Sequence, residues 1–403
     1  MRDTFLPYHV PCIGEAEIGS VTETLRSGWL TTGAKTRQFE DAFRQAVGAE
    51  HAIAVNSCTA ALHLALEAVG VERGDEVIVP TMTFAATAEV VAYFDAKPVL
   101  VDCQRDTYNM DPDAVEAAIG PRTRAIIPVH YGGQACDMTE LLDIAGRHDL
   151  KVVEDAAHAL PASYRGTSIG RIGDITCFSF YATKALTTGE GGMITTDDPA
   201  AAARMRMMAL HGISKDAWKR YTAEGSWYYE ILHPGFKYNL TDIAAALGVE
   251  QLKRQDEFRE ARARIAAQYT EAFAGLPAIR CPGVRPDRSH AWHLYVIEID
   301  SSQLRIGRDA FIEALRKEGI GTSVHFIPLH LHPYYRDRFG YRPADFPNAL
   351  HAYERMVSLP IYPGMTEADV EDVIRSVTTI VERERAVTAI SRSRLVAADW
   401  ACR

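Results

Sequence analysis

Between about residues 50 and 200, short apolar runs alternate with helical patterns. Most of the runs are continuous rather than alternating, which is typical of strands that are covered on both faces. The segments between them, such as 59–70, are predicted to be helices, and Gly70 is predicted to end that helix. This order predicts an α/β fold with a mainly parallel, seven-stranded sheet and helices on both faces. The predicted strands lie at 52–55, 76–80, 98–102, 125–130, 151–155, 175–180 and 192–196.

A second, smaller unit is predicted after the sheet. One long helix is expected at about 241–273, where apolar residues recur at helical spacing. A strand-like stretch, a further helix and a terminal helix from about residue 366 follow it. We therefore predict a large domain at 1–250 and a small C-terminal α/β domain at 251–403, divided inside the long helix. The tail at 385–403 either extends the last helix or frays.

The composition limits the classes of protein that this chain can represent. It has 403 residues, 47% of them hydrophobic, which is enough for a large core. No apolar run is long enough to span a bilayer, and the N-terminus has no hydrophobic region typical of a secretion signal. Seven cysteines without a C-x-x-C pair indicate reduced thiols. The net charge of −10, with no dense Lys/Arg block, argues against nucleic acid. We expect a cytoplasmic protein that binds neither membrane nor nucleic acid.

Several residues that can carry chemistry follow the carboxyl ends of predicted strands, where ligands bind in sheets of this kind. Asp155 ends one strand and His158 lies shortly after it. Residues 56–59 open a helix, whose free N–H groups favour a phosphate. Phe84 follows another strand, and Lys184 precedes a loop of threonines and glycines. Taken singly, each also has a structural explanation: a capping Asp, a surface His, a Ser/Thr helix cap or a core ring.

Taken together, these residues form the set that pyridoxal 5′-phosphate (PLP) requires. Its phosphate needs an anion site, and its flat ring needs a stacking partner. Its pyridine nitrogen must stay protonated and therefore needs an acid, and its aldehyde needs a lysine. The residue types thus favour a PLP enzyme.

Segments along nearly the whole chain resemble the DegT-type (DegT/DnrJ) family of PLP-dependent sugar aminotransferases. This family has fold type I, the aspartate aminotransferase-like fold. The resemblance implies a homodimer with shared active sites. The segments that carry it lie at 27–33, 56–66, 80–89, 129–137, 152–166, 178–193, 235–246 and 323–336.

The resemblance implies a role for each matching residue. Lys184 would form a Schiff base with the cofactor aldehyde and act as the catalytic proton shuttle. Asp155 would pair with the pyridine nitrogen, and His158 would lie beside the ring and its 3′ oxygen. We also expect burial and a nearby cationic environment to favour the neutral form of the Lys184 amine.

The remaining cofactor contacts also follow from the resemblance. Ser179, with Cys58 and Thr59 at the helix start, would hold the phosphate. Phe84 would stack on the cofactor ring. Asn239 would reach the phosphate of the neighbouring subunit.

Other residues are candidates for substrate contacts. Trp29 and Thr31 either line the sugar pocket or pack the N-terminal segment. His325 either contacts the sugar nucleotide or is structural; the spacing of it and the two histidines that follow matches no usual zinc site, so we expect no metal. Glu190 is expected in a turn, with orientation of the lysine loop as the alternative. The aromatic segment 227–238 is expected in a core or a dimer seam.

These features predict an aminotransferase that moves an amino group from L-glutamate to a keto group of a nucleotide-linked sugar. We expect the keto group at C4 and UDP as the nucleotide. The alternatives are action at C3, a dTDP- or GDP-linked sugar, a PLP lyase of the same fold, or a non-catalytic regulator. A dehydratase branch of the family carries histidine in place of the lysine, so Lys184 favours transamination.

Overall fold

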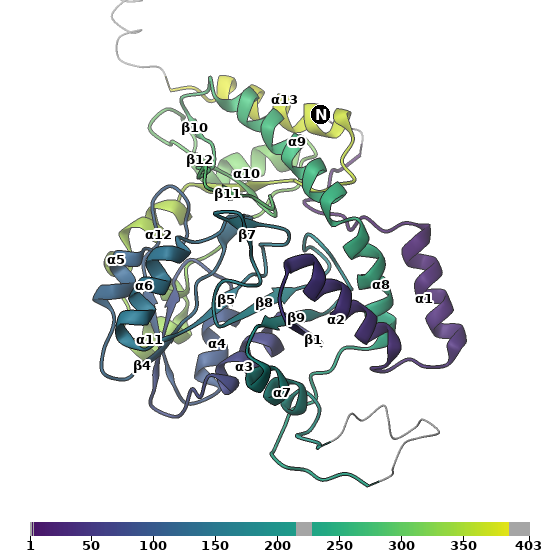
Figure 1. The fold of residues 1–403 in the computed structure, drawn as a ribbon. Coiled ribbons are helices and arrows are strands. Elements are labelled where there is room, and N and C mark those ends of the chain that lie inside the picture. The colour runs from purple at the N-terminus through teal and green to yellow at the C-terminus, as the bar shows by residue number, and fades with distance from the viewer. Residues whose placement is uncertain (1, 3, 215–227, 387–403) are drawn as a thin grey trace, which may run out of the picture.

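The computed structural model describes residue 2 and residues 4–214 and 228–386. Its first part is an α/β unit, and its second part carries a small sheet and the last helices (Figure 1). The first part contains α1 (Glu15–Ser27), α2 (Ala34–Val47), β1 (His51–Val55), α3 (Cys58–Ala68), β2 (Glu76–Pro80), α4 (Ala86–Ala92), β3 (Lys97–Val101), α5 (Pro112–Ala117), β4 (Thr123–Ile126), α6 (Met138–His148), β5 (Lys151–Asp155), β6 (Ser163–Tyr164), β7 (Thr167–Ser168), β8 (Ile175–Ser179), β9 (Gly192–Thr196), α7 (Pro199–Met208) and α8 (Asp242–Lys253). The second contains α9 (Gln255–Phe273), β10 (Ile279–Arg280), β11 (Arg288–Ser289), β12 (Tyr295–Ile299), α10 (Arg308–Lys317), α11 (Pro333–Phe339), α12 (Pro347–Tyr353), β13 (Met356–Leu359) and α13 (Glu367–Arg383).

All seven predicted strands are present and form one sheet in the order β1-β9-β8-β5-β4-β2-β3. Only β9 runs antiparallel to its neighbours in this sheet, β1 and β8. Alternate residues of β2 face opposite cores: Val77 and Val79 pack with α3 and α4, whereas Ile78 packs with α2 and α6. Helices on both faces thus explain why most of these strands contain continuous apolar runs. The predicted fold class is confirmed.

The helix boundaries differ from the prediction in one place. The expected helix at 241–273 is two helices, because Arg254 between α8 and α9 has φ −103° and ψ 5°. Arg254 forms ion pairs with Glu17 of α1 and Glu257 of α9, so the break directs its side chain toward both. The helix α8 packs on α1 and α2, whereas α9 packs on α13.

Gly70 ends α3, as predicted. Its φ of +76° lies in the left-handed region that favours glycine. The amide of Val71 binds the carbonyl of Leu66 at 3.0 Å and that of Gly70 binds Glu67 at 3.1 Å, the pattern of a Schellman motif.

The second part forms its own core but also exchanges segments with the first. Leu6, from the N-terminus, packs in the core formed by β12, β13, α9, α10 and α13. In the other direction, Tyr335 of α11 and Ala349 of α12 pack with the core of the large sheet. The predicted division at residue 250 stays a prediction, and these exchanges tie the two parts together.

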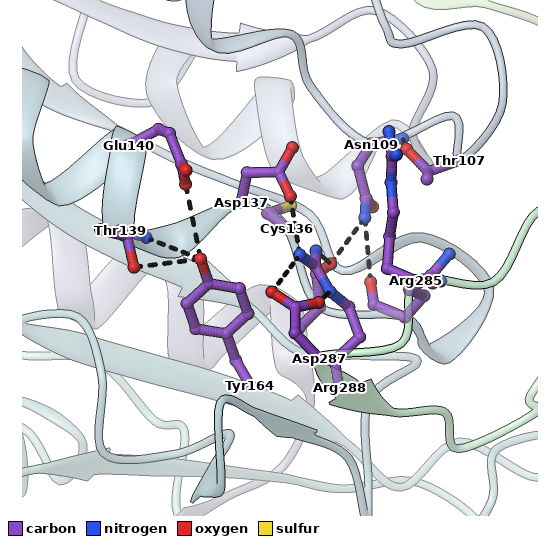
Figure 2. A network of polar contacts seen from close by, with 12 residues as sticks. Thr107, Asn109, Cys136, Asp137, Thr139, Glu140, Tyr164, Arg285, Asp287 and Arg288 are labelled. Carbon is purple, nitrogen blue, oxygen red and sulfur yellow. Dashed lines mark hydrogen bonds and ion pairs between the residues drawn. The ribbon is translucent and has the colours of Figure 1, made fainter.

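A polar network joins β11 to loops of the large sheet (Figure 2). The buried guanidinium of Arg288 pairs with Asp137 at 2.9 Å and Asp287 at 2.7 Å, and it lies over the ring of Tyr164. The hydroxyl of Tyr164 contacts Thr139 at 3.0 Å. A buried charge without a partner is costly, so this network fixes where β11 docks beside β6, with which it shares a small separate sheet.

The helix α13 ends at Arg383, so it does not extend into the tail, and Arg385 instead pairs with Leu304. Residues 387–403 lie outside the described residues. In the part of the chain that the structure describes, every helix is too short or too polar to cross a membrane.

Candidate active site

A cavity of about 370 Å³ opens where the carboxyl ends of β1, β2, β5 and β8 meet. This is the edge of a parallel sheet at which ligands bind, and the volume is in the range of cofactor sites. Eight of the predicted site residues line it: Cys58, Thr59, Phe84, Asp155, His158, Ser179, Lys184 and His325.

The start of α3 forms one wall of the cavity. Ser57 caps this helix by accepting a hydrogen bond from the amide of Ala60 at 3.1 Å. The N–H groups of Cys58 and Thr59 precede the first intrahelical bond, so a bound anion can accept from them. Gly192 lies so close that a Cβ there would be 2.6 Å from the carbonyl of Ser57, so only glycine lets β9 support this turn. The hydroxyl side chain of Ser179 lines the same cavity.

Asp155 is a buried carboxylate at the end of β5. It accepts hydrogen bonds from the hydroxyl of Thr87 at 2.8 Å and the amide of Ala157 at 3.1 Å. Burial raises its pKa, while these bonds and the charge of Lys184 act in the opposite direction. A carboxylate whose charge is disfavoured by burial is stabilised by a cationic partner, such as a protonated ring nitrogen.

Lys184 lies on a turn after β8, in which its amide binds the carbonyl of Tyr181 at 2.8 Å. Burial lowers the pKa of its amine, as expected. The expected cationic environment is wrong: its charged neighbour is Asp155, which raises the pKa and opposes the shift. Desolvation therefore favours the neutral amine, the form that attacks a carbonyl carbon.

His158 is held in a stack of rings inside the cavity. Its ring centroid lies 4.4 Å from that of His293 and 5.9 Å from that of Phe326. Its Nδ1 accepts from the amide of Gly132 at 3.3 Å, which leaves the ring proton on Nε2. Burial, with a smaller effect of Lys184, lowers its pKa well below the usual value, so the ring is neutral.

Phe84 is 63% exposed at the cavity wall, which rules out a core position. Its ring centroid is 6.1 Å from that of Phe326, which lies on the loop after α10. A flat ring open to a cavity can stack on a planar ligand.

Three other predicted residues lie away from this cavity in the described chain. The side-chain amide of Asn239 donates to the hydroxyl of Thr32 at 2.7 Å. Trp29 lines a separate cavity of about 590 Å³ beside Asp242, and the carbonyl of Thr31 accepts from the amide of Asp242 at 3.2 Å. The roles of Asn239, Trp29 and Thr31 in ligand binding stay predictions.

The structure adds cavity residues that the sequence analysis missed. His293 and Phe326 line the cavity, and Thr87 supports Asp155 from α4. His293 stands directly before the apolar run of β12, where a polar residue at a strand start was the available signal. Glu190, expected in a turn, is exposed and also lines the cavity. Among the described residues, no group of three or more His, Cys, Asp or Glu side chains is arranged to hold a metal ion.

These residues fit PLP by their geometry and their electrostatics. A helix start with free N–H groups suits its phosphate, the buried acid suits its ring nitrogen, and an exposed aromatic ring suits its flat face. A lysine with its neutral amine favoured suits its aldehyde. All four lie around one cavity.

Comparisons with known proteins agree with this assignment. The family model of the DegT/DnrJ/EryC1/StrS aminotransferases matches residues 11–378. SpsC, a spore coat polysaccharide biosynthesis protein of Bacillus subtilis, is 54% identical over 382 residues, which is 94% of this chain and 98% of SpsC. An uncharacterized protein of Methanocaldococcus jannaschii is 54% identical over 385 residues, which is 96% of this chain and 100% of that protein.

A solved structure gives the same result. The PLP form of Spr1654 from Streptococcus pneumoniae, assigned as a sugar aminotransferase, superposes with a TM-score of 0.87 at 35% identity. The match covers 94% of this chain and 99% of Spr1654. The predicted family, fold type and cofactor are thereby confirmed. The chain belongs to the DegT/DnrJ/EryC1/StrS aminotransferase family and is a PLP-dependent sugar aminotransferase of fold type I.

Proposed function

We propose that this protein moves an amino group from L-glutamate to a keto group of a nucleotide-linked sugar. Our specific assignment is the C4 keto group of a UDP-linked sugar. One observation carries the transamination step: Lys184, with its neutral amine favoured by burial, shares a cavity with the buried Asp155. The name of SpsC supports a sugar destined for a polysaccharide. Sugars reach polysaccharides as activated derivatives, which supports the nucleotide.

The residues of the chain divide the work. When bound, PLP supplies an electron sink for the carbon that loses a proton. The Nζ of Lys184 moves a proton between two carbons that flank the transferred nitrogen. One is the substrate carbon that bears the amino group, and the other is the former aldehyde carbon of the cofactor. A positioned base of this kind contributes ~10² to 10⁴ in rate. Asp155 holds the proton on the ring nitrogen, and the start of α3 orients the phosphate.

We also propose that the protein works as a homodimer in the cytoplasm. The segment 228–232 exposes large apolar side chains: Tyr228 is 49% exposed, Ile231 66% and Leu232 52%. Such a cluster on a surface marks an interface, here with a second copy. The predicted contact of Asn239 with the neighbouring phosphate lies on the same stretch of chain. Residue 227, which belongs to the predicted seam, lies outside the described residues.

The cytoplasmic location is supported by the cysteines. The six described cysteines are free thiols, which supports a reducing compartment.

The direct test is incubation of the purified protein with PLP, glutamate and a panel of nucleotide-linked keto sugars. Mass spectrometry should find an amino sugar, with the largest yield from a UDP-linked 4-keto sugar. Products from 3-keto sugars or from dTDP- or GDP-linked sugars would replace the C4 and UDP assignments. Release of ammonia without an amino sugar would indicate a lyase. Failure of glutamate to bleach the yellow holoprotein would indicate a non-catalytic regulator.

A further inference from the structure

The N-terminal segment 4–12 holds none of the residues predicted for the site, yet it contacts two stretches of chain that lead to site residues. Leu6 pairs with the chain after α10: its amide binds the carbonyl of Gly319 at 2.8 Å, and its carbonyl accepts from Gly321 at 2.8 Å. A Cβ on Gly321 would lie 2.8 Å from the amide nitrogen of Tyr8, so glycine is required for this approach. The ring of His9 hydrogen-bonds to the backbone of Ala182, two residues before Lys184. The segment therefore packs behind the site, against the chain that leads to His325 and the turn that carries Lys184.

A row of side chains leads from this segment to the cavity. The Nδ1 of His325 lies 2.8 Å from the hydroxyl oxygen of Ser358, which is fully buried on β13. Ser358 also hydrogen-bonds to the hydroxyl of Tyr8. The rings of Tyr8 and His325 are 5.5 Å apart. His325 lines the cavity, and because its Nδ1 is engaged, Nε2 is the ring nitrogen left to face a ligand.

Burial raises the pKa of Tyr8, so its hydroxyl keeps its proton and is available to donate to Ser358. In that arrangement the Ser358 hydroxyl donates to Nδ1 of His325, and the single ring proton is on Nε2. Burial, and to a smaller extent Lys184, lowers the pKa of His325 to about 4, so the ring is neutral near pH 7. The hydroxyl of Tyr131 also donates to the carbonyl of His325 and fixes its backbone.

We propose that Tyr8 and Ser358 are positioning residues that hold the Nε2–H of His325 toward the cavity, where it donates a hydrogen bond to a keto or hydroxyl oxygen of the acceptor sugar. A neutral N–H suits such oxygens, whereas the carboxylates of an amino-acid donor are bound best by cations. The inference rests on the proposed function and assigns His325 to the sugar half of the reaction.

The tautomer is tested without turnover. In holoprotein labelled with ¹⁵N-histidine, NMR should show His325 with an unprotonated Nδ1 and a protonated Nε2; the signal is assigned by its loss in His325→Gln. In Ser358→Ala the ring should populate both tautomers. A protonated Nδ1 in the unaltered protein would overturn the proposal.

Kinetics test the positioning role. Tyr8→Phe and Ser358→Ala should each raise KM for the keto sugar about tenfold, the loss of roughly one hydrogen bond. The rate at which glutamate bleaches the cofactor should stay unchanged. The matched controls are Tyr269→Phe, whose hydroxyl donates to the carbonyl of Pro360 at 2.9 Å, and the buried Ser376→Ala on α13. Both controls should leave both half-reactions unchanged.

Two kinetic results would overturn the proposal: equal losses in both half-reactions, or values for Tyr8→Phe and Ser358→Ala that match the controls. If no keto sugar is aminated at all, the proposed function fails. The NMR result then still decides whether Tyr8 and Ser358 set the tautomer of His325.

Discussion

The reactivity of Lys184 depends on two opposing effects at the scale of one side chain. Burial lowers the pKa of its amine, and the carboxylate of Asp155 raises it. The same pair acts on Asp155, whose pKa is raised by burial and lowered by the charge of Lys184. A cofactor with a positively charged ring nitrogen would neutralise the charge of Asp155. The pKa of the Lys184 amine would then be set mainly by desolvation, which lowers it.

Replacing Lys184 should distinguish covalent attachment of PLP from its non-covalent binding. We expect Lys184→Ala to bind PLP without a covalent link and to lose at least ~10² in turnover, because no other amine takes its proton-transfer role. Borohydride reduction followed by mass spectrometry of the intact protein measures the link. The control is Lys253→Ala, an exposed residue paired with Glu250. Full turnover in Lys184→Ala would contradict the assignment.

Residues at strand ends could be predicted from the sequence, whereas residues that reach the cavity from elsewhere could not. Asp155 and Ser179 end β5 and β8, so their positions followed from the strand pattern. Thr87 is placed by the packing of α4, which leaves no local signal. His293 is placed by the loop before β12, and its only local signal, a polar residue at a strand start, does not by itself indicate a site. The charge around Lys184 was also mispredicted, since it depends on which side chains fold against it.

At the scale of the element, the sheet was predictable because most of its strands contain a continuous apolar run bounded by polar or turn-forming residues. The break between α8 and α9 was not, because Arg254 has an ordinary helix propensity. Its backbone departs from the helix only where Glu17 of α1 and Glu257 offer partners on two sides. Tertiary contacts therefore decided this boundary.

The start of α3 combines a structural and a binding role, and the two can be separated. Ser57→Ala removes the cap of α3 and should cost about 1 kcal/mol of unfolding free energy. It should also weaken PLP binding, because the helix start that faces the phosphate loses its fixed geometry. Thr366→Ala, which removes the cap of α13, is the control. Thr366→Ala should lose a similar unfolding free energy and keep its PLP affinity, which fluorescence titration measures. Equal PLP affinities in Ser57→Ala and Thr366→Ala would contradict the binding role of the α3 start.

Glu154 stabilises three neighbouring elements from the inside of β5. It accepts from the ring of His130 at 2.9 Å, the amide of Gly173 at 2.7 Å and the hydroxyl of Thr176 at 2.7 Å. Burial alone would raise its pKa, but these bonds hold it below the ordinary value of 4.5. A lowered pKa in the folded state stabilises the protein above that ordinary value, and the contribution is lost as the pH falls through the folded pKa.

Glu154→Gln should therefore lower the unfolding free energy at pH 7 by about 3 kcal/mol, because the partners of a buried carboxylate are left poorly matched. The difference from the unaltered protein should shrink as the pH falls below about 4.5. Urea unfolding at several pH values measures it. Glu116→Gln, an exposed residue paired with Arg147, should show neither effect. A difference that grows on acidification would contradict the prediction.

At the scale of the whole molecule, the cavity of about 370 Å³ beside Lys184 is lined by residues that do not include Asn239. The proposed homodimer would bring Asn239 of one subunit to the phosphate of the other. Each site would then need residues from both copies, and no single chain would be complete.

Mixing two inactive variants tests this arrangement. Lys184→Ala should be inactive, and Asn239→Ala should be strongly impaired because the phosphate loses a donor. If sites are shared, a heterodimer of the two has one site with both changes and one site with neither. Unfolding and refolding an equal mixture should therefore restore about a quarter of full activity, because about half of the dimers are mixed and each has one intact site. The control mixes Lys184→Ala with Asp155→Ala, both from the same cavity, and should restore nothing, because every site in that mixed dimer carries one change. No recovery in the first mixture, with dimers present by size-exclusion chromatography, would show that Asn239 serves its own subunit.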